Sequence, residues 1–145
     1  MYFVDREKIE DTLTFMDMQM QTFHTITDLH DEFQKLALER VVHTMIESVL
    51  DVGNAMIDGF IMRDPGSYDD IIDILLDEKV INEDMAIHLK KIILLRKDLV
   101  QHYISVDHKK IYETVQQEWT SVEKFPERIR NYLINELGPV SAFRN

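Results

Sequence analysis

Apolar residues recur at intervals of three and four along most of this chain, a spacing that places side chains on one face of a helix. The first such stripe consists of Ile9, Leu13, Met16, Met20 and Phe23. Only four Gly and three Pro interrupt 145 residues, and no segment alternates apolar and polar residues with a period of two. The pattern predicts an all-α protein.

Five helical segments are expected, joined by short loops. They cover about residues 5–27, 32–62, 67–78, 82–105 and 107–137, with a kink or restart at Pro126 in the last and a stop at Gly138. The predicted N-caps are Asp5, Ser67, Asn82 and Asp107. Four long helices and one short inserted helix predict an antiparallel up-and-down bundle, with residues 1–145 forming a single domain.

The composition excludes several function classes. The chain has no Cys, which rules out disulfides, thiolate metal sites and a cysteine nucleophile. No apolar run approaches the ~20 residues of a membrane span, and the acidic start does not resemble a signal peptide, so we expect a cytoplasmic protein. No glycine-rich phosphate loop is present, and we expect no cofactor.

Charge is distributed unevenly along the chain. Its net value of −11 argues against binding DNA, RNA or anionic lipid by bulk charge. Residues 1–87 hold 6 basic and 20 acidic side chains, whereas residues 88–130 hold 9 basic and 6 acidic ones. The positive part contains Lys90, Lys91, Arg96, Lys97, His102, His108, Lys109 and Lys110. These residues form either a site for a polyanion or nucleotide phosphate, or a solvated helix face with i,i+4 ion pairs.

Arg96 lies on an apolar stripe. It precedes Tyr103 by seven residues and shares the face of Leu89, Ile92 and Leu99, so its charge needs an acceptor. A polar line on the central helix offers acceptors at Glu47, Asp51, Asn54 and Asp58. We therefore expect Arg96 to meet Glu47 or Asp51, either in a buried structural network or in a functional cleft.

A metal site is a third possibility for this polar line. His43, Glu47 and Asp51 are spaced i, i+4 and i+8 and could form one edge of such a site. No second segment carries the matching Glu-x-x-His of a carboxylate-bridged bundle site, so we expect no metal.

The segment Leu95-Arg96-Lys97-Asp98-Leu99-Val100-Gln101-His102-Tyr103, followed by Val106-Asp107, resembles the HepT-like family of the HEPN superfamily, especially its YutE-type branch. The likeness extends to the Asp5 helix start, the Glu47 to Asn54 helix, the loop at 65–68 and the tail at 138–141.

This resemblance implies an all-helical homodimer with a composite cleft between the subunits. The cleft is lined by a motif of Arg, four to six residues, His, and often a further residue and Tyr. Active members are metal-independent endoribonucleases that serve as toxins. Their antitoxin, the nucleotidyltransferase MntA, silences them by transferring AMP from ATP to the motif tyrosine.

Carried over by position, Arg96 matches the phosphate-binding arginine and Tyr103 the AMP acceptor. The usual spacing puts the histidine at 101, where this chain has Gln101, and His102 follows one residue later. On a continuous helix that shift turns the side chain by about 100°. Lys97 replaces the usual Asn after the arginine.

Two hypotheses follow from this departure. In the first, the helix ends or unwinds near His102, which then reaches the cleft, and the dimer cleaves RNA. In the second, catalysis is lost and the protein is an interaction module, either an AMP acceptor at Tyr103 or a nucleotide binder. In both, Gln101, Lys97, Glu47, Asp51 and Asn54 support the motif.

Overall fold

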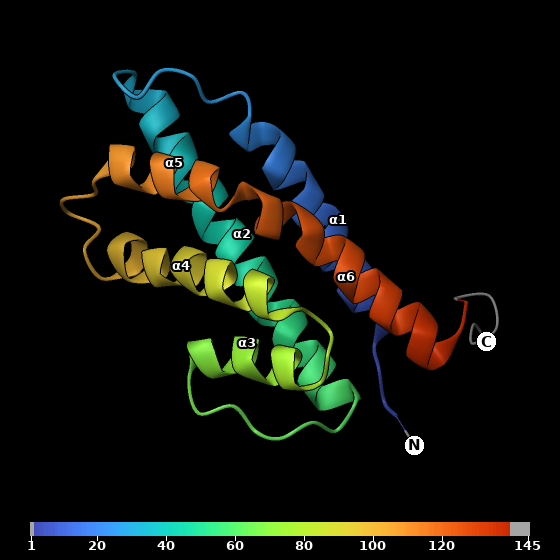
Figure 1. Ribbon diagram of the computed structural model, residues 1–145. Coiled ribbons are helices and arrows are strands. Elements are labelled where there is room, and N and C mark those ends of the chain that lie inside the picture. The colour runs from blue at the N-terminus through green and yellow to red at the C-terminus, as the bar shows by residue number, and fades with distance from the viewer. Residues whose placement is uncertain (1, 140–145) are drawn as a thin grey trace.

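Six helices and their connecting loops account for residues 2–139, the part of the chain that the computed structural model describes (Figure 1). They are α1 (Arg6–Phe23), α2 (Glu32–Gly59), α3 (Tyr68–Asp77), α4 (Glu83–Val100), α5 (His108–Gln117) and α6 (Trp119–Leu137). Within this range there is no strand, which confirms the all-α prediction. None of these helices has the length and apolar character needed to cross a membrane. Val140 and Ser141 of the tail lie outside the described residues.

The expected helix caps are present. Asp5, Ser67, Asn82 and Asp107 each accept a hydrogen bond from the backbone N–H three residues later, at 2.8–3.1 Å. These bonds satisfy donors that a helix leaves unpaired in its first turn. At the other end of the chain, Gly138 has a φ of 79° and stops α6, as predicted.

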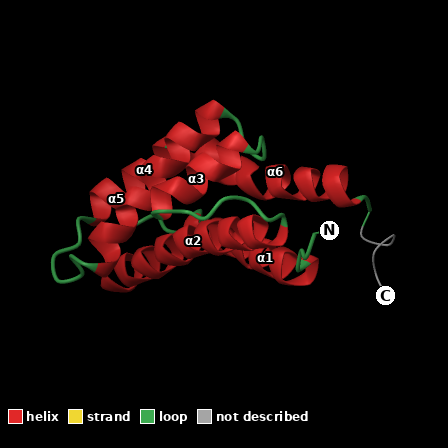
Figure 2. Cartoon of the chain, turned by 90° about the horizontal axis from the view of Figure 1, so that it is seen from below, coloured by secondary structure: helices red, strands yellow, loops and turns green. Residues whose placement is uncertain are grey.

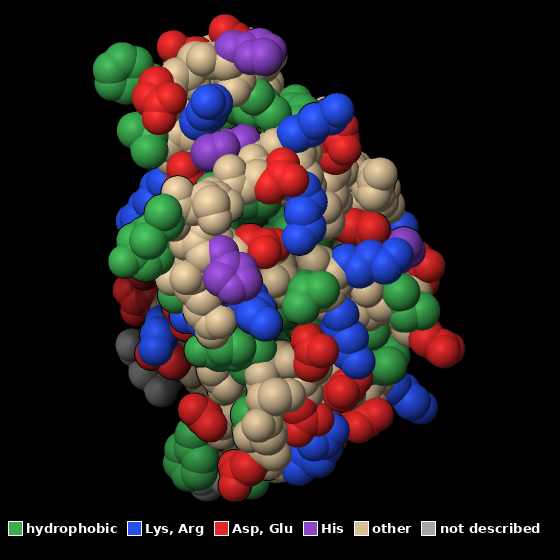
Figure 3. Space-filling view, turned by 90° about the vertical axis from the view of Figure 1, so that its left-hand side faces the viewer, with side chains coloured by type: hydrophobic (Ala, Val, Ile, Leu, Met, Phe, Trp, Pro, Cys, Tyr) green, Lys and Arg blue, Asp and Glu red, His purple; other side chains and the backbone are tan. Residues whose placement is uncertain are grey.

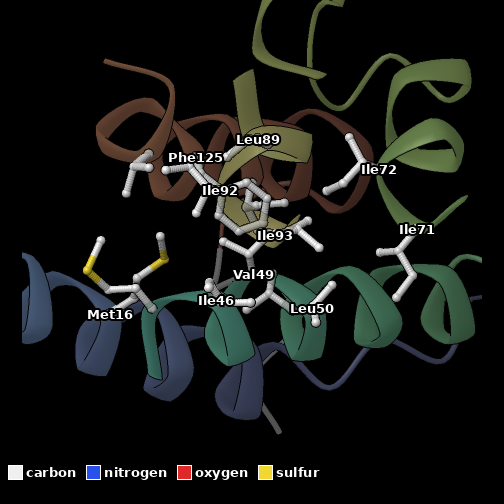
Figure 4. Packing of buried hydrophobic residues seen from close by; sticks show 14 of the residues in the cluster. Met16, Ile46, Val49, Leu50, Ile71, Ile72, Leu89, Ile92, Ile93 and Phe125 are labelled. Carbon is white, nitrogen blue, oxygen red and sulfur yellow. The ribbon is translucent and has the colours of Figure 1, made fainter. Parts of the chain in front are cut away.

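The helices form two layers around one apolar core (Figure 2). Helices α1 and α2 lie side by side in one layer, and α3 to α6 lie in the other. Figure 4 shows Ile92 and Ile93 of α4 and Phe125 of α6 packed over Ile46 and Val49 of α2. Burial on both sides explains why α2 is apolar on two faces.

The last predicted helix divides at a different residue from the one expected. The break between α5 and α6 lies at Glu118, and Pro126 sits inside α6 with its ring buried. Glu118 is also buried, and its carboxylate contacts His88 and Lys91 on α4. The break places the Glu118 carboxylate next to His88 and Lys91 of another helix. The effect of a proline on its own helix does not predict a contact between segments so far apart in the sequence.

Gly53 lets α3 approach α2 closely. A Cβ atom built at this position would lie 2.4 Å from Cγ2 of Ile71. Only a residue without a side chain allows this contact, so Gly53 lets Ile71 of α3 pack directly on α2. The start of α3 carries Ser67 and Tyr68.

Candidate functional site

Arg96 on α4 pairs with Glu47 on α2. The Nε of Arg96 donates to Oε1 of Glu47 at 2.7 Å, as the sequence predicted for one of two acidic partners. The side chains are 26% and 36% exposed, so the pair lies at the surface and not in a sealed core. The hydrogen bond that Arg96 donates to Glu47 raises the pKa of the guanidinium, against the opposing effect of burial. Arg96 is therefore charged, and Glu47 holds its guanidinium in a defined orientation.

Tyr68 provides a second contact to Arg96. The guanidinium carbon lies 4.7 Å from the centre of the Tyr68 ring, a cation–π arrangement. Tyr68 begins α3 directly after the Ser67 cap. Its loop is fixed by Asp70, whose carboxylate accepts from the Gly66 N–H at 2.8 Å and from Arg63 at 2.9 Å. Apart from the loop resemblance, no sequence signal pointed to Tyr68.

A hollow of about 290 Å³ lies beside this pair, between α4 and the start of α3. Its lining consists of Ser67, Tyr68, Asp69, Ile93, Leu94, Arg96, Lys97 and Gln101. Within residues 2–139, neither terminal nitrogen of Arg96 forms a hydrogen bond, because Glu47 engages only Nε. Two parallel N–H groups of this kind suit a phosphate.

The predicted polar line on α2 is only partly used. Asn54 lines a second hollow, of about 380 Å³, together with residues of the 65–68 loop and Ile71. Asp51 is exposed, lines neither hollow, and has no ion pair with any described residue. Of the three supporting residues expected on α2, Glu47 binds Arg96 and Asn54 lines the second hollow, whereas Asp51 does neither.

The motif runs past the end of α4. This helix stops at Val100, five residues before the expected end, and the Lys97 carbonyl accepts from the N–H groups of both Gln101 and His102. The prediction that one helical stripe continues to Tyr103 is therefore wrong. Helix periodicity no longer fixes the direction of residues beyond the end, and Tyr103 is 65% exposed.

Gln101 and His102 point to different surroundings. Gln101 lines the hollow with Arg96 and Lys97. His102 does not line the hollow. Its side chain is 56% exposed, and its Nδ1 lies 3.8 Å from a carboxylate oxygen of Asp98. The helix ends where the active-enzyme hypothesis requires it to end, while the side chain beside Arg96 is the glutamine.

The basic cluster predicted for residues 88–130 is largely neutralised. Its ion pairs are Lys90–Asp73, Lys91–Glu118, Lys110–Asp98, Lys109–Glu113 and His108–Glu39. Lys109–Glu113 has the i,i+4 spacing expected of a simple solvated helix face, and so does the 3.8 Å contact between His102 and Asp98. Figure 3, which looks onto the side of the α4–α5 loop, shows basic, acidic and His side chains interspersed. Polyanion binding on this face cannot depend on a continuous positive field.

His43 lies one turn before Glu47 on α2, and sequence reasoning assigned it only to a metal site. Its Nε2 lies 3.5 Å from the same Oε1 that binds Arg96. No group of three potential metal ligands occurs within residues 2–139. The sequence did not relate His43 to Arg96, because the two residues lie on different helices and are connected only through Glu47.

Comparison with known proteins places these features in a family. The family model described as Ribonuclease HepT-like matches residues 6–129. The Bacillus subtilis (strain 168) protein "Putative RNase YutE" is 56% identical over 144 residues, covering 99% of this chain and 100% of the relative.

Solved structures agree. A structure of the cytosolic B. subtilis protein of unknown function YutE has a TM-score of 0.95 at 56% identity, covering 99% of this chain and 100% of that one. A toxin-antitoxin structure with AMP-PNP has a TM-score of 0.74 at 17% identity, covering 83% of this chain and 96% of that one, and shares the fold. A mutant of the toxin-antitoxin MntA-HpeT has the same TM-score at 18% identity, covering 85% and 97%. The chain belongs to the HepT-like ribonuclease family.

Proposed function

We propose that this protein is a HepT-like toxin: a homodimeric, metal-independent endoribonuclease that an MntA-like nucleotidyltransferase neutralises by AMP transfer. The observation that carries the proposal is the state of Arg96. Glu47 holds its Nε at 2.7 Å and Tyr68 supports its face, while both terminal nitrogens remain available at the edge of a hollow. This is how a protein prepares an arginine for a phosphate.

The proposed chemistry divides between Arg96 and His102. Arg96 holds the scissile phosphate in two hydrogen bonds and stabilises the charge that develops there. His102 serves as a proton carrier, either as base toward the ribose 2′-hydroxyl or as acid toward the leaving oxygen. The end of α4 at Val100 supports this role, because His102 lies beyond the last helical residue and helix periodicity no longer sets its direction.

The dimer is supported by apolar side chains beside the site. Leu94 lines the hollow and is 69% exposed, and Ile87, seven residues earlier on α4, is also exposed. Residues seven apart lie on nearly the same helix face, so both side chains are exposed on one side of α4, with Lys90 and Lys91 between them. A second copy covering this side of α4 would enclose the hollow and bring two Arg96 side chains to one groove.

Neutralisation by AMP transfer is supported by the accessibility of Tyr103. Its ring is 65% exposed on the loop after α4, and its hydroxyl has no hydrogen-bond partner within residues 2–139. A bulky AMP group attached there needs no rearrangement of the core. The B. subtilis relative is described as cytosolic, and we propose the same compartment for this protein.

A second candidate function is a catalytically degenerate interaction module or nucleotide binder. The specific observation in its favour is that Gln101, which cannot transfer a proton, lines the hollow with Arg96, while His102 lies outside it. Under this alternative the site binds a phosphate without cleaving it.

Cleavage of a labelled RNA by the purified protein in EDTA separates the two functions. The toxin proposal expects cleavage that His102→Ala abolishes, and full activity of that variant would dismiss the role of His102. Absence of cleavage by the folded wild-type protein favours the interaction module. Intact-mass measurement after incubation with ATP and a cognate nucleotidyltransferase tests Tyr103: we expect one added AMP, absent from Tyr103→Phe.

A further inference from the structure

His43 and Arg96 converge on a single carboxylate oxygen. The His43 Nε2 lies 3.5 Å from Oε1 of Glu47, and the Arg96 Nε lies 2.7 Å from the same atom. The two nitrogens are therefore no more than the sum of these distances, 6.2 Å, apart. The imidazole of His43 therefore lies near the Nε side of the guanidinium, next to the hollow's lining and not within it.

Two glutamates flank His43 on α2, and each contacts a different neighbouring helix. Glu39 and Glu47 lie one turn before and one turn after it on α2. Glu39 accepts from Nε2 of His108 on α5 at 2.8 Å, and Glu47 binds Arg96 on α4. The His43 side chain is 34% exposed, so solvent and substrate can reach it. Each glutamate is held by a side chain from another helix, and Glu47 is the one that lies 3.5 Å from the imidazole.

RNA cleavage through the 2′-hydroxyl needs two proton transfers. The 2′-oxygen loses a proton as it attacks phosphorus, and the 5′-oxygen gains one as its bond to phosphorus breaks, leaving a 2′,3′-cyclic phosphate and a 5′-hydroxyl. A positioned side chain that carries one of these protons typically accelerates the reaction by about 10²- to 10⁴-fold. His102 alone supplies one carrier per subunit, and Gln101 supplies none.

We infer that His43 is a second acid–base residue of this site and accepts the proton of the ribose 2′-hydroxyl. One ring nitrogen of a neutral imidazole carries a lone pair, and this nitrogen takes the proton of the 2′-hydroxyl. His102 protonates the 5′-oxygen. This inference rests on the proposed ribonuclease function and adds the residue that begins the reaction.

The test compares His43→Ala and His43→Gln with wild type in RNA cleavage across pH. Glutamine can still donate to Glu47 but cannot carry the proton. We expect both variants to lose about 100-fold or more in kcat, with KM little changed, and to lose the rise in rate on the acidic side of the pH profile. His30→Ala, at an exposed loop position, is the matched control and should behave as wild type.

The possible outcomes distinguish the acid–base role of His43 from the proposed ribonuclease function. If Arg96→Ala abolishes cleavage but both His43 variants retain wild-type kcat and pH profile, the inference alone fails. If His43→Gln restores the activity lost in His43→Ala, His43 only positions Glu47, and the inference also fails. A folded wild-type protein that cleaves no RNA overturns the proposed function and this inference with it.

A measurement without turnover complements the kinetics. Protein carrying ¹³C-labelled histidine is titrated with an uncleavable 2′-deoxy oligonucleotide, and the imidazole signals are assigned with His43→Gln. We expect the His43 signal to move in wild type and to stay in place in Arg96→Ala. Binding that depends on Arg96 but leaves the His43 signal unmoved would place the ribose elsewhere and contradict the assignment.

Discussion

Arg96 and Glu47 are joined through a single hydrogen bond from Nε at 2.7 Å, which fixes the guanidinium and leaves its outer edge uncommitted. If a carboxylate also bound the terminal nitrogens of Arg96, the pair would only stabilise the fold. The side-on contact instead makes Glu47 a positioning residue for an arginine that faces a hollow. The following predictions depend on this difference.

Removing the Glu47 side chain should harm function more than stability. The pair is partly exposed, so Glu47→Ala should lower the free energy of unfolding by no more than about 1 kcal/mol, measured in urea. RNA cleavage should fall at least about tenfold, because Arg96 loses its direction. Glu47→Gln, whose amide oxygen can still accept from Nε, should retain more activity than Glu47→Ala. Glu127→Ala, at an exposed position on α6, is the control.

The ring of Tyr68 should matter more than its hydroxyl. Tyr68→Phe keeps the aromatic face 4.7 Å from the guanidinium and should bind RNA as wild type does. Tyr68→Ala removes a cation–π contact of about 0.5–1 kcal/mol and should weaken RNA binding by roughly two- to fivefold. Fluorescence anisotropy with an uncleavable labelled oligonucleotide measures both. Equal loss in the two variants would assign the effect to the hydroxyl instead.

Gly53→Ala should destabilise the packing of α3. The new Cβ would lie 2.4 Å from the Ile71 side chain, and the resulting overpacking should cost about 1–3 kcal/mol, partly offset by the higher helix propensity of Ala. Urea unfolding measures the difference. Gly66→Ala is the matched control: its Cβ would meet nothing nearer than an oxygen of Asp70 at 3.7 Å, so little change is expected.

Asp70 should make the stability of the α2–α3 loop depend on pH. Its pKa is lowered from the usual 3.8, chiefly by the hydrogen bond from Arg63 and then by the Gly66 N–H. A carboxyl with a lowered pKa stabilises the fold above its usual pKa and loses that contribution as pH falls through the lowered value. Asp70→Asn should therefore lower Tm slightly at neutral pH and reduce the decline in Tm below pH 3.8. Asp64→Asn, in the same loop, should leave both unchanged.

The local parts of this structure could be read from the sequence. Each cap depends on a side chain and an N–H three residues away, and the stripe from Ile9 to Phe23 depends on helix periodicity alone, so both were predicted. The Arg96–Glu47 pair was also predicted, since a charge on an apolar stripe needs an acceptor.

Features that depend on contacts between distant segments could not be read in this way. The break at Glu118 depends on His88 and Lys91 of another helix. Tyr68 reaches Arg96 only because α3 packs closely on α2, and the end of α4 at Val100 turned Tyr103 away from the predicted stripe.

The most direct test of this account is RNA cleavage in EDTA by Arg96→Lys and Arg96→Ala, each compared with wild type at matched Tm and matched oligomeric state. Lysine keeps the charge but lacks the two parallel N–H groups. We predict cleavage by a wild-type dimer and a loss of about 100-fold or more in both variants. Wild-type rates in Arg96→Ala, or a strictly monomeric active protein, would contradict the phosphate-binding role of Arg96 in a shared cleft.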